Sequence, residues 1–338
     1  MKVSFITFGG RDIGTGHLFR CLAMADWMRK LNLNVEISFY LFDSGFEVQD
    51  KAIKILQSRS NYPCSIQNIN SIKTMVFDTV VMDLLDVSLD LMELIKKKSN
   101  FVVTIDNVSN SRELSNIAIN PLYYKINRSK IKNDYVGPKF QIISHKFINK
   151  ISHWKNKVEK ILIIQGGSDP YELVPKIAKD IELILLDKTI SLHLIVGPAA
   201  NKSNELMNFS ISYKGQIVIH ENIIDMSSFL EDIDLAISSV GVVAFEIASM
   251  GIPAIHVTGV EKELETAEAM SDLGVSVNIG LYNSLSTDLN DVLVKLIDTA
   301  SLRGDMRDNC LKNFKVGFSR KLIEIIAKGD IDEEHQIS

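Results

Sequence analysis

Strand-like apolar runs alternate with helical patterns along most of the chain, and this alternation constrains the fold more than any other feature. The first series of apolar runs comprises Val3–Phe8, Val35–Phe42, Thr79–Met82, Phe101–Ile105 and Ile117–Ile119. The second comprises Ile161–Ile164, His193–Val196, Gln216–Ile219, Leu235–Ile237, Ala254–Val257 and Val275–Ile279. Helical patterns separate many of these runs; they include Leu18–Leu31, Leu89–Lys98, Tyr171–Leu186, Met226–Asp232, Val243–Met250 and Glu263–Leu273. Such alternation predicts parallel sheets covered by helices on both faces, an α/β fold.

The length of the chain and a polar stretch near its middle predict two domains. A chain of 338 residues exceeds what one hydrophobic core usually supports. We therefore expect an N-terminal Rossmann-like domain over residues 1–150, a C-terminal Rossmann-like domain over 151–328, and a polar tail over 329–338. Ligands of open parallel sheets bind beyond the carboxyl ends of the strands, so two facing domains would share one cleft.

Composition excludes several classes of function. The net charge of −5 provides no general basic field, which argues against a nucleic-acid partner. The three cysteines form no CxxC pair, which indicates neither a disulfide framework nor a zinc site. The sequence shows no signal-peptide pattern and no apolar run of about 18 residues, the length that spans a bilayer. We therefore expect a cytoplasmic protein without a transmembrane segment.

The first strand is followed by a glycine-rich loop that ends in a histidine. The segment "GGRDIGTGH" places Gly14, Thr15 and Gly16 directly before His17. A dinucleotide fingerprint would need glycine at position 19, which is Phe19, and no P-loop motif occurs. The loop can bring backbone N–H groups close to a ligand, and it delivers His17 as a candidate general base at the first turn of a helix. A packed or helix-capping histidine is the alternative.

Arg20 follows one helical turn after His17. Its guanidinium could reach a phosphate, or it could be solvated, and the sequence does not decide between the two.

A second glycine loop opens the second half of the chain. The strand pattern in "ILIIQGGSDP" ends in Gly166, Gly167, Ser168 and Asp169. The backbone N–H groups and the Ser168 hydroxyl could bind a diphosphate. Alternatively, Ser168 or Asp169 is only the N-cap of the next helix.

A third loop follows the strand in "DLAISSVGVVAFEIASMGIPAIHV", residues 234–257. Ser239, Val240 and Gly241 come after the strand, and Glu246 lies in the helix that follows. A carboxylate among apolar neighbours needs a partner; ribose hydroxyls would serve, and so would a lysine or arginine.

Together these motifs carry a family resemblance. The pattern G-x-G-H-x-x-R-C-L-A-M-A, the GGSDP segment and the DLAI-S-x-x-G-x-x-x-x-E segment before G-I-P occur in this order, with "TIDN" at 104–107 and "YVGPKF" at 135–140 between the first two. Over about residues 1–280 the chain resembles the UDP-sugar hydrolase of pseudaminic acid biosynthesis and related spore-coat polysaccharide proteins. That group belongs to the GT-B superfamily.

The resemblance implies roles for individual residues. It implies that His17 activates water, that the GGSDP loop and Ser239–Gly241 lie near the diphosphate, and that Glu246 binds the ribose. It also implies that backbone near His220–Ile223 contacts uracil.

Two segments depart from the family pattern. Asp83 is followed by Leu84 and Leu85, where the family usually has a histidine and a tyrosine. The family's N-A-E segment reads Thr266-Ala267-Glu268, so a hydroxyl replaces a ligand-binding amide. The sugar pocket is therefore the part where we expect a difference.

The motifs together with this resemblance imply an enzyme that hydrolyses a UDP-linked, acetamido-deoxy sugar to free sugar and UDP, in nonulosonic-acid or surface-polysaccharide biosynthesis. His17 would be the catalytic base, and glycine-loop amides and a helix dipole would stabilise the leaving diphosphate, so that no metal or other cofactor is required. The predicted nucleotide- and substrate-binding residues are Gly14, Thr15, Gly16, Arg20, Gly166, Gly167, Ser168, Asp169, Ile223, Ser239, Val240, Gly241, Glu246 and Thr266. The alternatives are a GT-B glycosyltransferase with a non-water acceptor and a nucleotide-sugar-binding subunit without activity.

Overall fold

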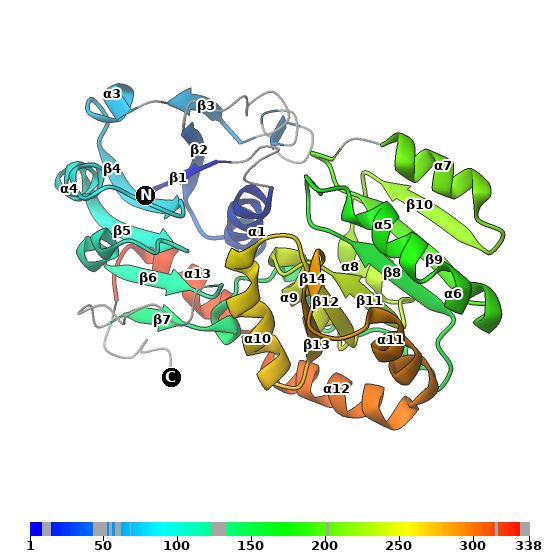
Figure 1. Ribbon diagram of the computed structural model, residues 1–338. Coiled ribbons are helices and arrows are strands. Elements are labelled where there is room, and N and C mark those ends of the chain that lie inside the picture. Colours follow the sequence, from blue (N-terminus) through cyan, green and yellow to red (C-terminus); the bar gives the residue numbers. More distant parts are fainter. Residues whose placement is uncertain are drawn as a thin grey trace. The chain divides into compact units, whose positions relative to one another are not determined.

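The computed structural model describes residues 1–8, 15–42, 53, 56–57, 62–67, 69–122, 133–200, 203–314 and 317–331. The chain forms two compact units (Figure 1). Unit 1 comprises Met1–His145 together with the C-terminal segment from Val316, and unit 2 comprises Lys146–Lys315. Within the described residues, no helix is both long and apolar enough to cross a bilayer.

Unit 1 is built on a seven-stranded parallel sheet in the order β3-β2-β1-β4-β5-β6-β7. Its strands are β1 (Lys2–Thr7), β2 (Glu36–Phe42), β3 (Cys64–Gln67), β4 (Phe77–Asp83), β5 (Ser99–Ile105), β6 (Ile117–Asn120) and β7 (Asp134–Val136). Its helices are α1 (Gly16–Lys30), α3 (Ile69–Ile72), α4 (Leu89–Lys98) and α13 (Gly317–Lys328). Apolar side chains fill both faces of the central strands, as expected for a parallel sheet covered on both sides.

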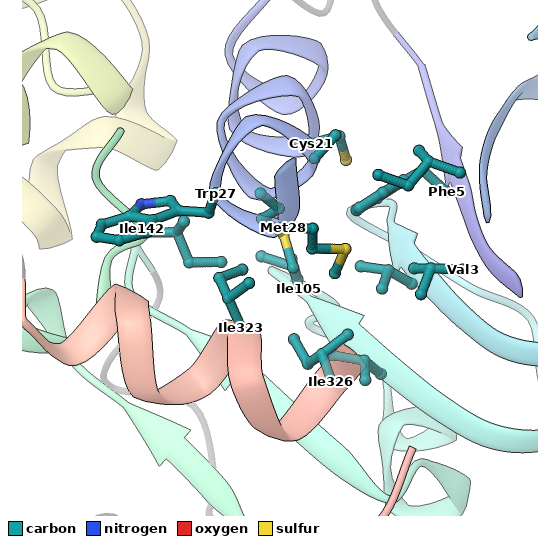
Figure 2. Close-up of a cluster of buried hydrophobic side chains, with 14 of the residues drawn as sticks. Val3, Phe5, Cys21, Trp27, Met28, Ile105, Ile142, Ile323 and Ile326 are labelled. Carbon is teal, nitrogen blue, oxygen red and sulfur yellow. The ribbon is translucent and has the colours of Figure 1, made fainter. Parts of the chain in front are cut away.

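The last helix, α13, completes the core of unit 1. Figure 2 shows Ile323 and Ile326 of α13 with Trp27 and Met28 of α1, all in one buried cluster. The prediction that the second domain extends to residue 328 is therefore wrong. The apolar side chains of α13 recur at helical spacing. They are buried against α1 and against the face of the sheet that α1 covers.

The boundary between the two units also differs from the predicted boundary at residue 150. Ser152 N donates to Met250 O at 2.8 Å, and Lys150 Nζ lies 3.0 Å from Glu231 Oε1. These contacts attach residues 150–152 to unit 2. Unit 2 therefore begins at residue 146, slightly before the predicted boundary.

Unit 2 is built on a second seven-stranded sheet in the order β10-β9-β8-β11-β12-β13-β14, in which only the short β14 is antiparallel. Its strands are β8 (Lys160–Ile164), β9 (Ser191–Val196), β10 (Ile217–Glu221), β11 (Leu235–Ser238), β12 (Ala254–Thr258), β13 (Ser276–Leu281) and β14 (Ser284–Leu285). Its helices are α5 (Leu173–Asp180), α6 (Glu182–Lys188), α7 (Asn204–Ser212), α8 (Met226–Leu230), α9 (Val242–Ser249), α10 (Leu264–Asp272), α11 (Leu289–Asp298) and α12 (Ala300–Asn313). The segment predicted as one helix, 171–186, forms two helices that meet at Ile181.

Each sheet has one point at which the strand order reverses. In unit 1 this point lies between β1 and β4, and in unit 2 it lies between β8 and β11. Ligands of such sheets bind at the carboxyl ends of the strands next to this reversal. The loops after β1, β4, β8 and β11 are therefore the positions where a functional site is expected.

Candidate active site

His17 lies in the first turn of α1 and contacts the end of β4. Its Nδ1 atom is 2.6 Å from Oδ1 of Asp83, the last residue of β4, and only 8% of the His17 residue surface is exposed. The ring of Phe8, just after β1, packs edge-on against the imidazole with a centroid distance of 4.8 Å. The parallel register that pairs Thr7 with Asp83 brings these groups together.

Asp83 fixes the tautomer of the imidazole. Burial alone would raise the pKa of Asp83, but the Arg20 guanidinium and then His17 outweigh burial and hold the pKa at about 2. The carboxyl group is therefore ionised and can only accept a hydrogen bond, so Nδ1 of His17 must donate. This leaves the lone pair on Nε2, the arrangement that a histidine general base requires.

Arg20 is buried behind His17 and is bound by two carboxylates. Its Nε donates to Asp83 Oδ2 at 2.8 Å and its Nη2 donates to Asp83 Oδ1 at 2.7 Å, which is a bidentate pair. Nη2 also lies 2.6 Å from Asp106 Oδ2, and Nη1 donates to Gln141 Oε1 at 3.3 Å. Arg20 is 1% exposed. The alternative that it is solvated is therefore wrong, and its guanidinium is engaged by protein carboxylates.

Asp106 is the second carboxylate of this cluster and follows directly after β5. Burial raises its pKa, an effect that the positive charge of Arg20 opposes and the charge of Asp83 reinforces. His17, Asp83 and Asp106 each offer one ligand-type atom, and these atoms lie within 4.8 Å of one another. Such a trio could bind a divalent cation. Here, however, the guanidinium of Arg20 already contacts both carboxylates, so their negative charge is partly neutralised by the protein itself.

The sequence reasoning missed Asp83, Asp106 and Gln141 as members of the site. The adjacent ends of β4 and β5 bring Asp83 and Asp106 together. The available signal was an acidic residue directly after each of two neighbouring buried strands. Leu84 and Leu85, which replace the family's polar residues after Asp83, pack into the apolar core beside α4.

The glycine loops of unit 2 meet at the carboxyl edge of its sheet. Gly166 has a φ of +69°, and a Cβ atom there would lie 3.6 Å from Ser239 Oγ. A Cβ atom on Gly197, just after β9, would lie 2.4 Å from Gly167 O, so only glycine fits this approach. Ser239 N also donates to Ile164 O at 3.3 Å. The structure thus brings together the loops after β8, β9 and β11.

Asp169 takes the capping role that the sequence left open. Its carboxylate accepts hydrogen bonds from Leu173 N at 2.8 Å and Val174 N at 3.0 Å. Burial raises the pKa of Asp169, against the effect of these two bonds. The first N–H groups of α5 are therefore already bound by a protein carboxylate.

Helix α9 begins differently. It starts after Gly241 with no side-chain cap and with no acidic residue in its first turn. Its first N–H groups have no partner within the helix, and the helix dipole places partial positive charge there. The N-terminus of α9 thus differs from that of α5, where the Asp169 carboxylate accepts hydrogen bonds from Leu173 N and Val174 N.

The remaining predicted site residues differ in accessibility. Glu246 and Ile223 are half-buried, Ser168 and Ser239 are largely buried, and Thr15, Val240 and Thr266 are almost completely buried. Gly16 is the first residue of α1, whereas Gly14 lies outside the described residues. Thr266 lies in the first turn of α10.

Two curated proteins show sequence similarity to the chain. The spore coat polysaccharide biosynthesis protein SpsG of Bacillus subtilis is 24% identical over 291 residues, which cover 83% of this chain and 84% of SpsG. The uncharacterized protein MJ1062 of Methanocaldococcus jannaschii is 30% identical over 276 residues, which cover 75% of this chain. The chain spans about half of that longer protein, 55% of its length. No protein-family model matches.

Solved structures settle the fold. MurG of Acinetobacter baumannii superposes with a TM-score of 0.65 at 14% identity, covering 97% of this chain and 99% of MurG. The chain has the GT-B fold. It is also homologous to SpsG. Another GT-B neighbour is the UDP-GlcNAc 2-epimerase of Neisseria meningitidis bound to UDP-GlcNAc, with a TM-score of 0.57 at 13% identity, covering 98% of this chain and all of the epimerase.

Proposed function

We propose that this GT-B protein hydrolyses a UDP-linked sugar to the free sugar and UDP. The observation that carries the proposal is the hydrogen bond of 2.6 Å between His17 Nδ1 and Asp83 Oδ1, which leaves Nε2 as a base at the carboxyl edge of a parallel sheet. The homology to SpsG supports a role in polysaccharide biosynthesis. The resemblance carried by the sequence motifs suggests the pathway to nonulosonic acids.

The reaction is a displacement at the anomeric carbon. His17 Nε2 takes a proton from water as the water oxygen bonds to this carbon. The bond between the anomeric carbon and the diphosphate oxygen breaks, and its electron pair leaves with UDP. The proton on His17 then passes to solvent. Asp83 orients the ring through its hydrogen bond to Nδ1, as the carboxylate does in serine hydrolase triads.

Unit 2 is the proposed nucleotide-binding unit. The first N–H groups of α9 and the loop Ser239–Gly241 would stabilise the negative charge that develops on the departing diphosphate. Glu246, one turn further along α9, would accept hydrogen bonds from the ribose hydroxyls. Backbone near Ile223, after β10, would contact the uracil.

A glycosyltransferase with a sugar or amino acceptor is the second candidate. The fold shared with MurG is compatible with either reaction, since hydrolysis and glycosyl transfer differ only in the nucleophile. Release of UDP from a UDP-sugar without any added acceptor supports hydrolysis. Release that requires an acceptor supports transfer, and tight binding without turnover supports a binding subunit.

The bond that breaks is tested by isotope labelling. A panel of UDP-sugars is first screened for release of UDP, with excess chelator present. The active substrate is then turned over in ¹⁸O-labelled water, and both products are read promptly by mass spectrometry with a control for exchange of the free sugar. Label in the anomeric hydroxyl supports the proposal. Label in the nucleotide phosphate would show attack at phosphorus and refute it.

A further inference from the structure

The buried cluster of unit 1 contains a second carboxylate, which is paired with Arg20. Asp106 Oδ2 lies 2.6 Å from Arg20 Nη2, and the same Nη2 donates to Asp83 Oδ1 at 2.7 Å. That oxygen of Asp83 is also the one bonded to His17 Nδ1. Asp106 is therefore connected to His17 through Arg20 and Asp83 in turn.

An ionised Asp106 decides whether the formal charges of the cluster cancel. From α1 come His17, Arg20 and Cys21, from β4 comes Asp83, and after β5 comes Asp106. Burial raises the pKa of the Cys21 thiol, so this group stays uncharged. Arg20 and Asp83 balance each other. Phe8 and Gln141, which also contact the cluster, are uncharged, as is the backbone N–H of Leu122 near Asp106 Oδ1.

An ionised Asp106 would consequently leave the cluster one negative charge in excess while the imidazole is neutral. Both carboxylates and the guanidinium are almost completely withdrawn from water, where charges are weakly screened. When Nε2 of His17 accepts a proton, the cluster becomes neutral. Asp106 thus favours the state that the proposed base reaches during the reaction.

The backbone at Asp106 allows its charge to be removed without a change of shape. Its φ is +53°, a left-handed conformation that costs most residues free energy but is tolerated by both aspartate and asparagine. Asp106→Asn therefore keeps the backbone preference and the size of the side chain.

We infer that Asp106 is a positioning residue that acts through Arg20: it holds Nη2 between two carboxylates and supplies the negative charge that balances the protonated His17. It does not contact the substrate. The inference rests on the role proposed for His17.

The first test is the pH profile of UDP release by the full chain. In Asp106→Asn we expect kcat to fall, with KM changed by less than about threefold, since the interaction lies outside substrate contact. We also expect the acid limb of kcat to move to lower pH by about one unit or more, because a charge within 4.8 Å of the imidazole has been removed. The exposed Asp86, three residues after Asp83, provides the matched control Asp86→Asn. An Asp106→Asn profile identical to that of the wild type would overturn the inference, as would a rise in KM with kcat unchanged.

The second test does not depend on turnover. The short hydrogen bond between His17 Nδ1 and Asp83 should give a far-downfield proton resonance in the NMR spectrum of the wild type. In Asp106→Asn, Arg20 is no longer shared with Asp106 and binds Asp83 more strongly, which weakens the competing bond and moves the resonance upfield. A resonance that is absent in His17→Asn but identical in wild type and Asp106→Asn would refute the positioning role. If the resonance moves but no UDP-sugar is turned over, the proposed function fails while the inference stands.

Discussion

At the residue scale, the chemistry of unit 1 depends on which contacts each side of the His17 ring makes. One ring nitrogen is bound by the Asp83 carboxylate, and the Phe8 ring covers part of the imidazole. The other nitrogen carries the lone pair. This division of roles turns an ordinary helix-terminal histidine into a candidate base.

His17→Asn removes that base and keeps a polar side chain at the position. We expect turnover to fall by about 10²–10⁴, the usual contribution of general acid–base catalysis. UDP affinity should stay within several-fold, because the nucleotide is assigned to unit 2. Steady-state release of UDP and calorimetric titration with UDP measure the two effects. Near-normal turnover would remove His17 from the mechanism.

At the element scale, helix α13 and strand β12 each lead to a prediction about the stability of the unit that contains them. Helix α13 closes the core of unit 1, although 170 residues of unit 2 separate it from the rest of that unit. Strand β12 lies inside the sheet of unit 2 and carries a completely buried histidine, His256. Each unit also contains one of the two tryptophans, Trp27 or Trp154, so their unfolding can be followed separately.

Ile323→Ala should destabilise unit 1 by about 2–5 kcal/mol, because it leaves a cavity between α13 and α1. Urea unfolding in a Trp154→Phe background reports unit 1 through Trp27. The exposed Lys328→Ala, on the same helix, should change stability by less than about 0.5 kcal/mol. A loss that appears only in the Trp154 signal of unit 2, recorded in a Trp27→Phe background, would contradict the assignment of α13.

His256 should make unit 2 sensitive to acid. Burial lowers its pKa to about 4, although a hydrogen bond with Ser238 acts in the opposite direction. In the unfolded chain the pKa is about 6.5, so the unfolded state binds the proton first as the pH falls. The contribution of the neutral imidazole is fully present above about pH 6.5 and decreases by about 3 kcal/mol by pH 4.

The measurement is urea unfolding of unit 2 between these pH values, followed by Trp154 in a Trp27→Phe background. His256→Gln should flatten the dependence on pH, whereas His153→Gln, at a largely exposed histidine, should keep most of it. Equal slopes in the two variants would show that His256 is not the cause.

At the scale of the whole molecule, the two units divide the proposed work. Unit 1 holds the base in a charged, buried cluster, and unit 2 presents glycine loops and an uncapped helix terminus. Each unit is a parallel sheet with its own point of strand-order reversal. The comparison with MurG extends over both units, since it covers 97% of the chain.

UDP should therefore protect unit 2 of the intact protein. In hydrogen exchange we expect slower exchange in segments 165–169 and 239–246 on addition of UDP, with little change in α1. Glu246→Ala should weaken UDP binding by about 1.5–3 kcal/mol, the usual worth of a hydrogen bond to a charged group. Calorimetry measures this loss, and Glu231→Ala, at a carboxylate bound to Lys150, is the control. Protection confined to unit 1 would contradict the proposal that UDP binds unit 2.

The sequence by itself determined the repeating architecture. The apolar runs predicted most of the strands of both sheets to within a few residues, because a strand buried on both faces must be apolar along its length. The same pattern missed β3, β7 and β14, which are short strands toward the edges of the sheets. The GGSDP and Ser239–Gly241 loops were also visible, since glycine is required where backbones approach as closely as Gly197 and Gly167 do.

Only the tertiary structure decided the composition of the charged cluster and the place of α13. Asp83 and Asp106 are 66 and 89 positions from His17 in the sequence, and no local pattern connects them. They meet His17 and Arg20 because parallel pairing aligns the carboxyl ends of β1, β4 and β5 at one edge. The apolar side chains of α13 predict burial but not the partner. The surface that covers them comes from α1, whose last residue, Lys30, lies 287 positions before Gly317, the first residue of α13. Both the charged cluster and the place of α13 therefore depend on long-range packing, which requires the whole fold.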